Sequence, residues 1–142
     1  MKQTRVMKAL ADETRLRLMN ILLAAKVPLC VCEMVDALSL PQYQVSRHLL
    51  ILKNAELVKV EKEGTWAYHS VEKENDANAT VFEFLEAFLT SETFDLDRKQ
   101  LERRLRLRED GKCIVGFPPE GKLSPRHFER GRMHTKERVW RA

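Results

Sequence analysis

Residues 42–57, QYQVSRHLLILKNAEL, carry the pattern that decides the fold. The side chains that recur at helical spacing along one side of this segment are Val45, His48, Leu49 and Leu52. With about 100° of rotation per residue, the polar side chains of the segment point away from that stripe. The segment therefore predicts a helix that is buried on one side and presents hydrogen-bonding side chains on the other. His48 is expected to be a packed core histidine rather than a metal ligand.

A second short helix is predicted just before this segment. Val31, Met34, Val35 and Leu38 follow the i, i+3, i+4, i+7 spacing of an amphipathic helix over about residues 31–38. A serine-leucine-proline break then separates it from the longer helix. A break this short is the kind that a helix-turn-helix motif needs.

Residues 57–71, LVKVEKEGTWAYHSV, change from helical to alternating periodicity. Alternation on both sides of the turn Glu63-Gly64-Thr65 predicts a two-stranded β-hairpin. Two short helices, the second with a polar face, followed by a hairpin are typical of a winged helix-turn-helix. The predicted fold is therefore mostly α with a β-hairpin wing.

Further helices are predicted on both sides of this unit. Asp12 is the expected N-cap of a helix from Glu13 to Ala25, whose largely apolar circumference places it in the core. The helix over residues 76–89 carries a wider apolar stripe than a monomer of this size needs to bury. We therefore expect it to form a homodimer interface, together with the N-terminal helix. The residues predicted in that interface are Val6, Leu10, Val81, Phe84, Leu85 and Phe88.

The chain divides into three predicted parts. Residues 1–94 are expected to form a winged helix-turn-helix domain for DNA binding and dimerisation. Residues 95–108 predict a basic helical extension, either solvated or packed as a second helix against the domain. Residues 109–142 are dominated by glycine, proline and charge, which predicts a partly disordered C-terminal tail.

Composition limits the classes of function. Residues 1–94 carry 11 lysines and arginines against 13 carboxylates, so the basic excess behind the net charge of +4 lies further along the chain. Any DNA contact by the domain then needs a local basic patch. The chain contains no recognisable signal peptide or membrane span, which predicts a cytoplasmic protein with reduced thiols and no membrane partner. It also has no βαβ unit, cofactor loop or catalytic pair, so we expect neither an enzyme nor a catalytic cofactor.

Four stretches together resemble the arsenic-responsive repressors of the ArsR/SmtB family. They are ALADETRLRLMNILL (9–23), LCVCEM (29–34), ALSLPQYQVSRHLLILKNAELV (37–58) and EGTWAYHSV (63–71). The VSRHL segment is typical of the whole family, and the CVC segment of its arsenic-, lead- and cadmium-sensing branch. The resemblance covers roughly residues 5–90. It implies a homodimeric winged-helix repressor that leaves its operator when a metal or metalloid binds.

The resemblance assigns the polar front of the 42–57 helix to double-stranded operator DNA. Arg47 is expected to contact a guanine or a phosphate, while Gln42 and Gln44 are expected to read adenine. The alternative is that these side chains form an ordinary solvated face. The residues predicted to contact DNA are Gln42, Tyr43, Gln44, Ser46 and Arg47 from the helix, with Lys59 and Lys62 from the wing.

The three cysteines of the chain are the candidate inducer ligands. Cys30 and Cys32 occupy the metal-sensing position of the family, and Cys113 is the remaining thiol. As(III) prefers three thiolates in a pyramid, so these three would suffice for arsenite or antimonite, whereas a four-thiolate cadmium site cannot come from one chain. Three alternatives stay open. Cys113 is only a small buried side chain, the ion is cadmium, lead or zinc with ligands from a partner chain or from histidines, or the thiols form a redox switch.

The chain departs from the family pattern at two positions. Pro41 stands where members often have a serine as N-cap of the recognition helix, so the cap comes from Ser39, from Pro41 as a first-turn residue, or is absent. Val35 stands where arsenic sensors with all ligands in one helix have a third cysteine. Residues 1–29 also lack the cysteine that cadmium and lead sensors supply from an N-terminal arm.

The spacing of the cysteine pair predicts a mechanism of release. In a regular helix, residues i and i+2 differ by about 200° in direction, which places Cys30 and Cys32 on opposite flanks of the apolar stripe. We therefore expect an ion to unwind or bend the first turn of the 31–38 helix. Such a distortion would tilt Arg47 out of register with the DNA.

Overall fold

The helices and strands follow one another in the predicted order, with one additional strand. The structure, a computed structural model, describes residues 1–117. Most of the tail for which partial disorder is predicted, residues 118–142, lies outside the described residues. The elements are α1 (Lys2–Leu10), α2 (Glu13–Ala25), β1 (Leu29–Cys30), α3 (Val31–Leu38), α4 (Gln42–Asn54), β2 (Val58–Glu63), β3 (Trp66–Val71), α5 (Ala77–Phe88) and α6 (Glu92–Leu105).

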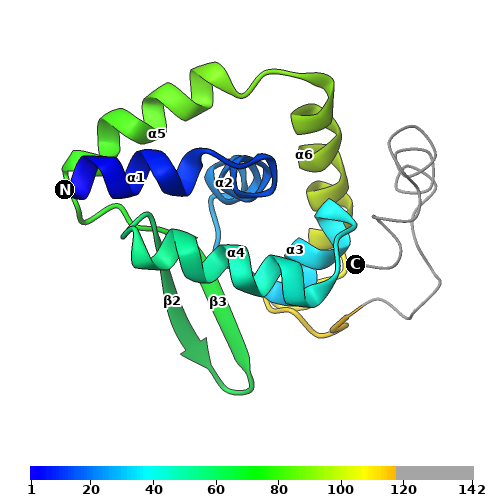
Figure 1. Cartoon of the computed structure of the whole chain (residues 1–142). Coiled ribbons are helices and arrows are strands. Elements are labelled where there is room, and N and C mark those ends of the chain that lie inside the picture. Colours follow the sequence, from blue (N-terminus) through cyan, green and yellow to red (C-terminus); the bar gives the residue numbers. More distant parts are fainter. Residues whose placement is uncertain (118–142) are drawn as a thin grey trace.

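The winged helix-turn-helix consists of α3, α4 and the hairpin β2–β3. The two strands pair antiparallel from Val58 opposite Val71 to Glu63 opposite Trp66. Gly64 takes the left-handed conformation that this tight turn requires, with φ of 62°. Figure 1 shows α4 and the hairpin on one side of the molecule and α5 on the opposite side, with α1 and α2 between them. The predicted fold, mostly α with a β-hairpin wing, is confirmed.

A third strand joins the wing, and the sequence did not predict it. β1 pairs antiparallel with β3, so the sheet order is β1-β3-β2. Leu29 lies opposite His69, and Cys30 lies opposite Tyr68. Two residues are too few to display the alternation that identifies a strand. The consequence is that the first cysteine belongs to the sheet that carries the wing.

The helix caps resolve one alternative in the sequence. Asp12 caps α2 as predicted, because its side chain accepts a hydrogen bond from the Arg15 N–H at 3.1 Å. Pro41 occupies the N-cap position of α4, which has no side-chain cap. Ser39 instead ends α3 in the left-handed conformation, with φ of 55°. The recognition helix α4 therefore begins without the capping hydrogen bond that a serine would supply.

α6 is a packed helix rather than a solvated extension. It begins at Glu92, so the predicted domain boundary between residues 94 and 95 falls inside it. Its inward face is buried against α2 and α3, and even Arg104 is almost fully covered. The basic segment therefore contributes to the core domain. Helical periodicity alone did not distinguish the two options, because the inward face combines leucine with paired charges.

Buried ion pairs hold α6 in place. The Arg17 guanidinium donates from Nε to Asp97 Oδ2 at 2.7 Å and from Nη2 to Asp97 Oδ1 at 3.0 Å. Arg17 also donates to the carbonyl of Leu38, the last residue of α3. Arg104 donates to Asp36 Oδ2 at 2.8 Å, which joins α6 to α3 directly. α2, α3 and α6 are thus fixed relative to one another by directional, charge-assisted contacts.

The two faces of α5 differ from the predicted stripe. Phe82, Leu85 and Leu89 are buried in the chain's own core, with Leu85 only 1% exposed, so the prediction that Leu85 faces a partner is wrong. The remaining members of the predicted set divide in two. Val6, Leu10 and Val81 are half-buried against the same core, whereas Phe84 and Phe88 are 54% and 61% exposed. The rings of Phe84 and Phe88 stack with centroids 4.9 Å apart. Pairing of this surface with a second chain remains a prediction.

Within residues 1–117, no helix combines the length and apolar character needed to cross a bilayer.

His48 is buried as predicted, with Nδ1 3.0 Å from Arg15 Nη1. It therefore belongs to the buried face of α4.

Removal of the Asp97 carboxylate should strongly destabilise the fold. Asp97→Ala leaves the Arg17 guanidinium buried and unmatched, and we expect it to lower the free energy of unfolding by about 3–5 kcal/mol. Urea denaturation followed by circular dichroism measures this change. Asp95→Ala is the matched control on the same helix, because its ion pair with Arg98 is solvent-exposed and should contribute less than about 1 kcal/mol. Equal losses for the two variants would contradict the assignment.

Stability should also fall in mildly acidic solution. Burial lowers the pKa of His48 despite the nearby Asp12 carboxylate, and Arg15 and Arg47 lower it further. The unfolded chain then binds a proton more tightly than the folded one, so the stabilisation is complete above about pH 6.5 and is lost as the pH falls toward the folded pKa. Urea midpoints from pH 7.5 to 5.5 should fall less steeply for His48→Gln than for the unaltered chain. Parallel curves would exclude His48 as a source of the dependence.

Candidate functional site

The structure brings the three cysteines together at the N-terminal end of α3. The Sγ atoms of Cys30 and Cys32 are 2.9 Å apart, and those of Cys32 and Cys113 are 3.4 Å apart. All three sulfurs lie within 4.8 Å of one another. The residues are 1%, 1% and 3% exposed, and none forms a disulfide. The result is a buried cluster of three reduced thiols contributed by segments 81 residues apart in the sequence.

The predicted separation of Cys30 and Cys32 is wrong. Cys30 is not part of the helix: it is the N-cap of α3, with the extended backbone angles φ −87° and ψ 160°. The 200° rule for helical residues i and i+2 therefore does not apply to this pair. The two thiols are already in contact, and an ion need not unwind the first turn of α3 to reach both.

A tight turn after α6 delivers the third thiol. Glu109 and Lys112 exchange two backbone hydrogen bonds, of 3.0 and 2.9 Å, and Cys113 follows directly. The Cys113 N–H donates to the hydroxyl of Tyr68 at 3.2 Å. Tyr68 is the residue that pairs with Cys30 across β1 and β3. One strand of the wing thereby contacts the backbone of two of the three cysteines.

A buried carboxylate orders the backbone beside the thiols. Glu33 Oε1 accepts the N–H of Cys30 at 3.1 Å. Arg108 donates to both carboxylate oxygens of Glu33, from Nε and Nη2, each at 2.7 Å. Burial alone would raise the pKa of Glu33, but the hydrogen bonds from Arg108 and Cys30 outweigh it and hold that pKa below its ordinary value. Glu33 is therefore a buried anion matched by one fixed cation.

The thiol cluster lies under two aromatic side chains, and its first thiol is held in the protonated form. The hydrogen bond with Cys32, together with burial, raises the pKa of the Cys30 thiol. Trp66 and Tyr68 cover the cluster, and Arg104 lies with Nη2 4.0 Å from Cys113 Sγ. Because thiolates are the binding form, an ion that enters must displace protons.

The three sulfurs are close enough together to become ligands of one thiophilic ion after a change in their spacing. Bonds of about 2.3 Å, with angles between roughly 95° and 110°, require sulfur–sulfur separations of roughly 3.4–3.8 Å. The 3.4 Å separation of Cys32 and Cys113 reaches this range, whereas the 2.9 Å separation of Cys30 and Cys32 is shorter, so an ion must move these two sulfurs apart. Within residues 1–117, these three cysteines are the one group of at least three cysteine, histidine or carboxylate side chains that lie close enough together to hold a metal ion.

The residues predicted to contact DNA lie on the recognition helix and the wing. Gln42, Tyr43, Ser46 and Arg47 are exposed on α4, while Gln44 is half-buried. On β2, Lys62 is exposed, and Lys59 is half-buried with Nζ 3.8 Å from Glu61 Oε1. α4 and the hairpin lie on the same side of the molecule (Figure 1). The predicted polar front is thus exposed, and its contact with DNA stays a prediction.

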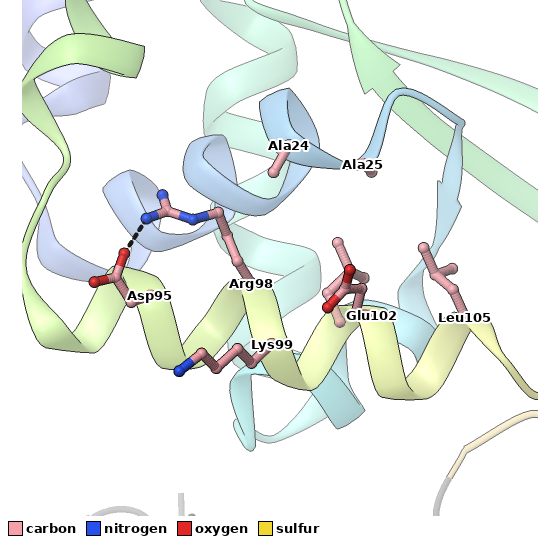
Figure 2. Close-up of a pocket in the computed structure, with 8 residues that line it drawn as sticks. Ala24, Ala25, Asp95, Arg98, Lys99, Glu102 and Leu105 are labelled. Carbon is pink, nitrogen blue, oxygen red and sulfur yellow. Dashed lines mark hydrogen bonds and ion pairs between the residues drawn. The ribbon is translucent and has the colours of Figure 1, made fainter.

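A separate groove lies between the end of α2 and one face of α6 (Figure 2). Arg98, which lies in it, is paired with Asp95 and donates to Asn20 Oδ1. The groove contains no thiol and none of the predicted DNA contacts, so it is not part of the candidate site. Its lining residues are Ala24, Ala25, Asp95, Arg98, Lys99, Leu101, Glu102 and Leu105.

The residues that surround the thiols were not predicted. Glu33 had a readable signal, because a glutamate three residues after an N-cap is typical of a capping box. Successive side chains of a strand point to opposite faces, so Tyr68 lies on the face of β3 opposite Ala67 and His69. Its large aromatic side chain indicates that this second face of the wing is also buried. Arg108 had no local signal, since its partner lies 75 residues earlier in the chain.

Comparison with known proteins identifies the family. Residues 12–60 match the model of the bacterial regulatory proteins of the arsR family. An HTH-type transcriptional regulator of Methanocaldococcus jannaschii is 44% identical over 70 residues, which are 49% of this chain and 78% of that protein. The arsenic resistance transcriptional regulator ArsR1 of Pseudomonas putida is 44% identical over 69 residues, or 49% of this chain and 53% of that protein. The cadmium resistance regulatory protein CadC homolog of Staphylococcus aureus is 35% identical over 75 residues, or 53% of this chain and 61% of that protein.

The fold has a counterpart among solved structures. HlyU from Vibrio cholerae N16961 matches with a TM-score of 0.54 and 27% identity, covering 63% of this chain and 94% of that one. The chain spans little more than half the length of the arsenic and cadmium regulators named above. It spans 78% of the length of the Methanocaldococcus jannaschii regulator, at 44% identity. On this evidence the chain belongs to the arsR family of bacterial regulatory proteins, a family of helix-turn-helix transcriptional regulators and not of enzymes.

Proposed function

We propose that this protein is a cytoplasmic transcriptional repressor that responds to arsenite or antimonite. It binds double-stranded operator DNA as a homodimer and is released when As(III) or Sb(III) binds Cys30, Cys32 and Cys113. The observation that carries the proposal is the buried three-thiol cluster beside the helix-turn-helix. Relatives named as arsenic resistance regulators support the same inducer class.

The chemistry of binding is an exchange of hydroxyl groups for thiols. Arsenite in neutral solution is As(OH)₃, and each cysteine thiol that attacks arsenic forms one As–S bond while one As–O bond breaks. The thiol proton leaves with the hydroxyl as water, so three cysteines release three water molecules. No oxidant or reductant takes part, and the product carries no net charge.

Release of DNA follows from where the three ligands sit. Cys30 belongs to β1, which pairs with the wing strand β3, and Cys32 lies in α3, which packs against the recognition helix α4. An ion that pulls the sulfurs to its own spacing therefore acts on the wing and on α3 together. Coupling of about 1–3 kcal/mol between two sites corresponds to a 5–150-fold loss of affinity.

DNA binding is assigned to the exposed front of α4 and to the wing. Arg47 is the principal contact to a guanine or a phosphate, with the neighbouring polar residues and the two wing lysines completing the surface. The stacked, exposed rings of Phe84 and Phe88 support α5 as part of the dimer interface.

Two alternatives of the same fold have specific support. A cadmium, lead or zinc response is favoured by the relative named as a cadmium resistance regulator, and it needs ligands beyond the three thiols. A redox response is favoured by the contact of 2.9 Å between two thiols, which hydrogen peroxide could join as a disulfide while it is itself reduced to two waters. Release by peroxide without arsenite would establish the second alternative.

Arsenite response should require all three thiols. Cys30→Ser, Cys32→Ser and Cys113→Ser should each bind operator DNA as the unaltered protein does, yet need at least about tenfold more arsenite for release, because each removes one As–S bond. Fluorescence anisotropy of a labelled duplex from upstream of the gene, titrated with arsenite and separately with cadmium, measures both properties. A Cys30/Cys32 double variant that still responds would locate the sensor elsewhere.

Arg47→Ala should weaken operator binding with or without the inducer. Loss of a bidentate base contact costs about 1–3 kcal/mol, or roughly 5- to 150-fold in affinity. The same anisotropy assay measures it, and Arg103→Ala, an exposed arginine on α6, is the control of equal charge change. Equal affinities for Arg47→Ala and the unaltered protein would remove Arg47 from the DNA interface.

A further inference from the structure

Arg108 contacts every segment that contributes to the thiol cluster. Its guanidinium binds Glu33 through two hydrogen bonds of 2.7 Å. Nη2 also donates to the carbonyl of Pro28 at 2.7 Å, and Nη1 donates to the carbonyl of Gly111 at 3.1 Å. Its central carbon lies 5.7 Å from the centre of the Tyr68 ring. One side chain therefore joins the approach to α3, the turn before Cys113 and the wing.

These contacts lie on both sides of the site. Cys30 stands between Pro28 and Glu33, and its own N–H is held by Glu33. Cys113 follows Gly111 by two residues, and it is the thiol that comes from a distant segment. Arg108 thus fixes the backbone around the first ligand and the backbone that presents the third.

The other attachments of this turn are of different strength. Lys112 pairs with Glu63 at the wing tip at 2.9 Å, but both side chains are about 60% exposed, so solvent screens the pair. Arg104 holds the far side through the carbonyl of Gly116. The bidentate pair of Arg108 with Glu33 is almost completely buried, which makes it the strongest charge-assisted contact between the turn and α3.

We propose that Arg108 is a positioning residue that makes the cluster a three-thiol site, and that it thereby sets the class of arsenical the site prefers. This inference rests on the proposed function. With Arg108 in place, Cys113 is held beside Cys30 and Cys32, and the site suits inorganic arsenite. Without it, the turn loses its strongest contact with α3 and Cys113 is held less firmly, whereas a two-thiol site remains because Cys30 is still held by β3 pairing.

The two classes of arsenical differ in the number of bonds they can exchange. Arsenite exchanges three hydroxyls for three thiols and releases three waters. Phenylarsine oxide is PhAs(OH)₂ in water, and its As–C bond does not exchange. It therefore forms two As–S bonds with two thiols, breaks two As–O bonds and releases two waters. The ratio of the two affinities reports whether the third thiol is in place.

The test is direct binding to the purified, reduced, full-length protein in the absence of DNA. Arg108→Ala should weaken arsenite binding by about 10–100-fold, the usual effect of losing a residue that orients a ligand, and should leave phenylarsine oxide binding nearly unchanged. The double variant E33Q/R108A removes the risk of a stranded buried carboxylate, while the side-chain amide oxygen that E33Q introduces still accepts the Cys30 N–H. Cys113→Ser should give the same selectivity, and Arg106→Ala, an exposed arginine two residues earlier, should match the unaltered protein.

Alkylation followed by mass spectrometry counts the thiols that remain free. Arsenite should protect all three in the unaltered protein, and phenylarsine oxide should leave one free in both proteins. The inference is overturned if the double variant keeps full arsenite affinity, or if it loses both arsenicals equally. If the unaltered protein binds arsenite through three thiols and the variant loses only arsenite, yet arsenite does not release DNA, then the inference stands and the proposed function fails.

Discussion

Three arginine–carboxylate pairs fasten α6 and the turn after it to the rest of the domain, and the thiol site depends on them. Arg17 with Asp97 joins α2 to α6, Arg104 with Asp36 joins α6 to α3, and Arg108 with Glu33 joins the following turn to the start of α3. Buried charges require partners, so each pair defines one geometry more strictly than apolar packing would. Cys113 reaches the other two thiols only in that geometry.

The site lies at a junction between the two elements that a winged helix-turn-helix uses to hold DNA. Cys30 ends β1 and is paired with Tyr68 of the wing strand, while Cys32 lies in the first turn of α3, which packs on α4. Packed interfaces of this kind shift between discrete arrangements rather than deforming smoothly. The lengthening of the Cys30–Cys32 separation from 2.9 Å that an ion requires, by at least about half an ångström, can therefore act on wing and recognition helix together. This route replaces the unwinding of α3, since the extended backbone of Cys30 already brings its thiol to Cys32.

Local sequence patterns predicted much of the fold. They failed where contacts between distant segments determine the structure. The stripe from Val31 to Leu38 and the alternation after Leu57 predicted α3 and the wing closely, because their periods are properties of neighbouring residues. The same helical rule failed at Cys30, one residue before the helix begins. β1 was too short to display a period, and the burial of α6 depends on partners in α2 and α3. Of the site, the three thiols were identified from residue type and family resemblance, and Glu33 carries the local signal of a capping box, whereas Arg108 became visible only through its contact with Glu33.

The balance of charge around the cluster favours a trivalent metalloid over a divalent cation. Three thiolates bound to As(III) give a neutral group, whereas three thiolates bound to a divalent cation carry one negative charge. A buried charge is costly unless a cation is fixed beside it. The two arginines nearest the thiols are already matched, Arg108 by Glu33 and Arg104 by Asp36, so neither carries charge in excess of its own carboxylate. A cadmium complex would have to draw Arg104 away from Asp36 or recruit water and a fourth ligand. Each of these changes would disturb the contact between α6 and α3, whereas the proposed neutral arsenic complex would require neither of them.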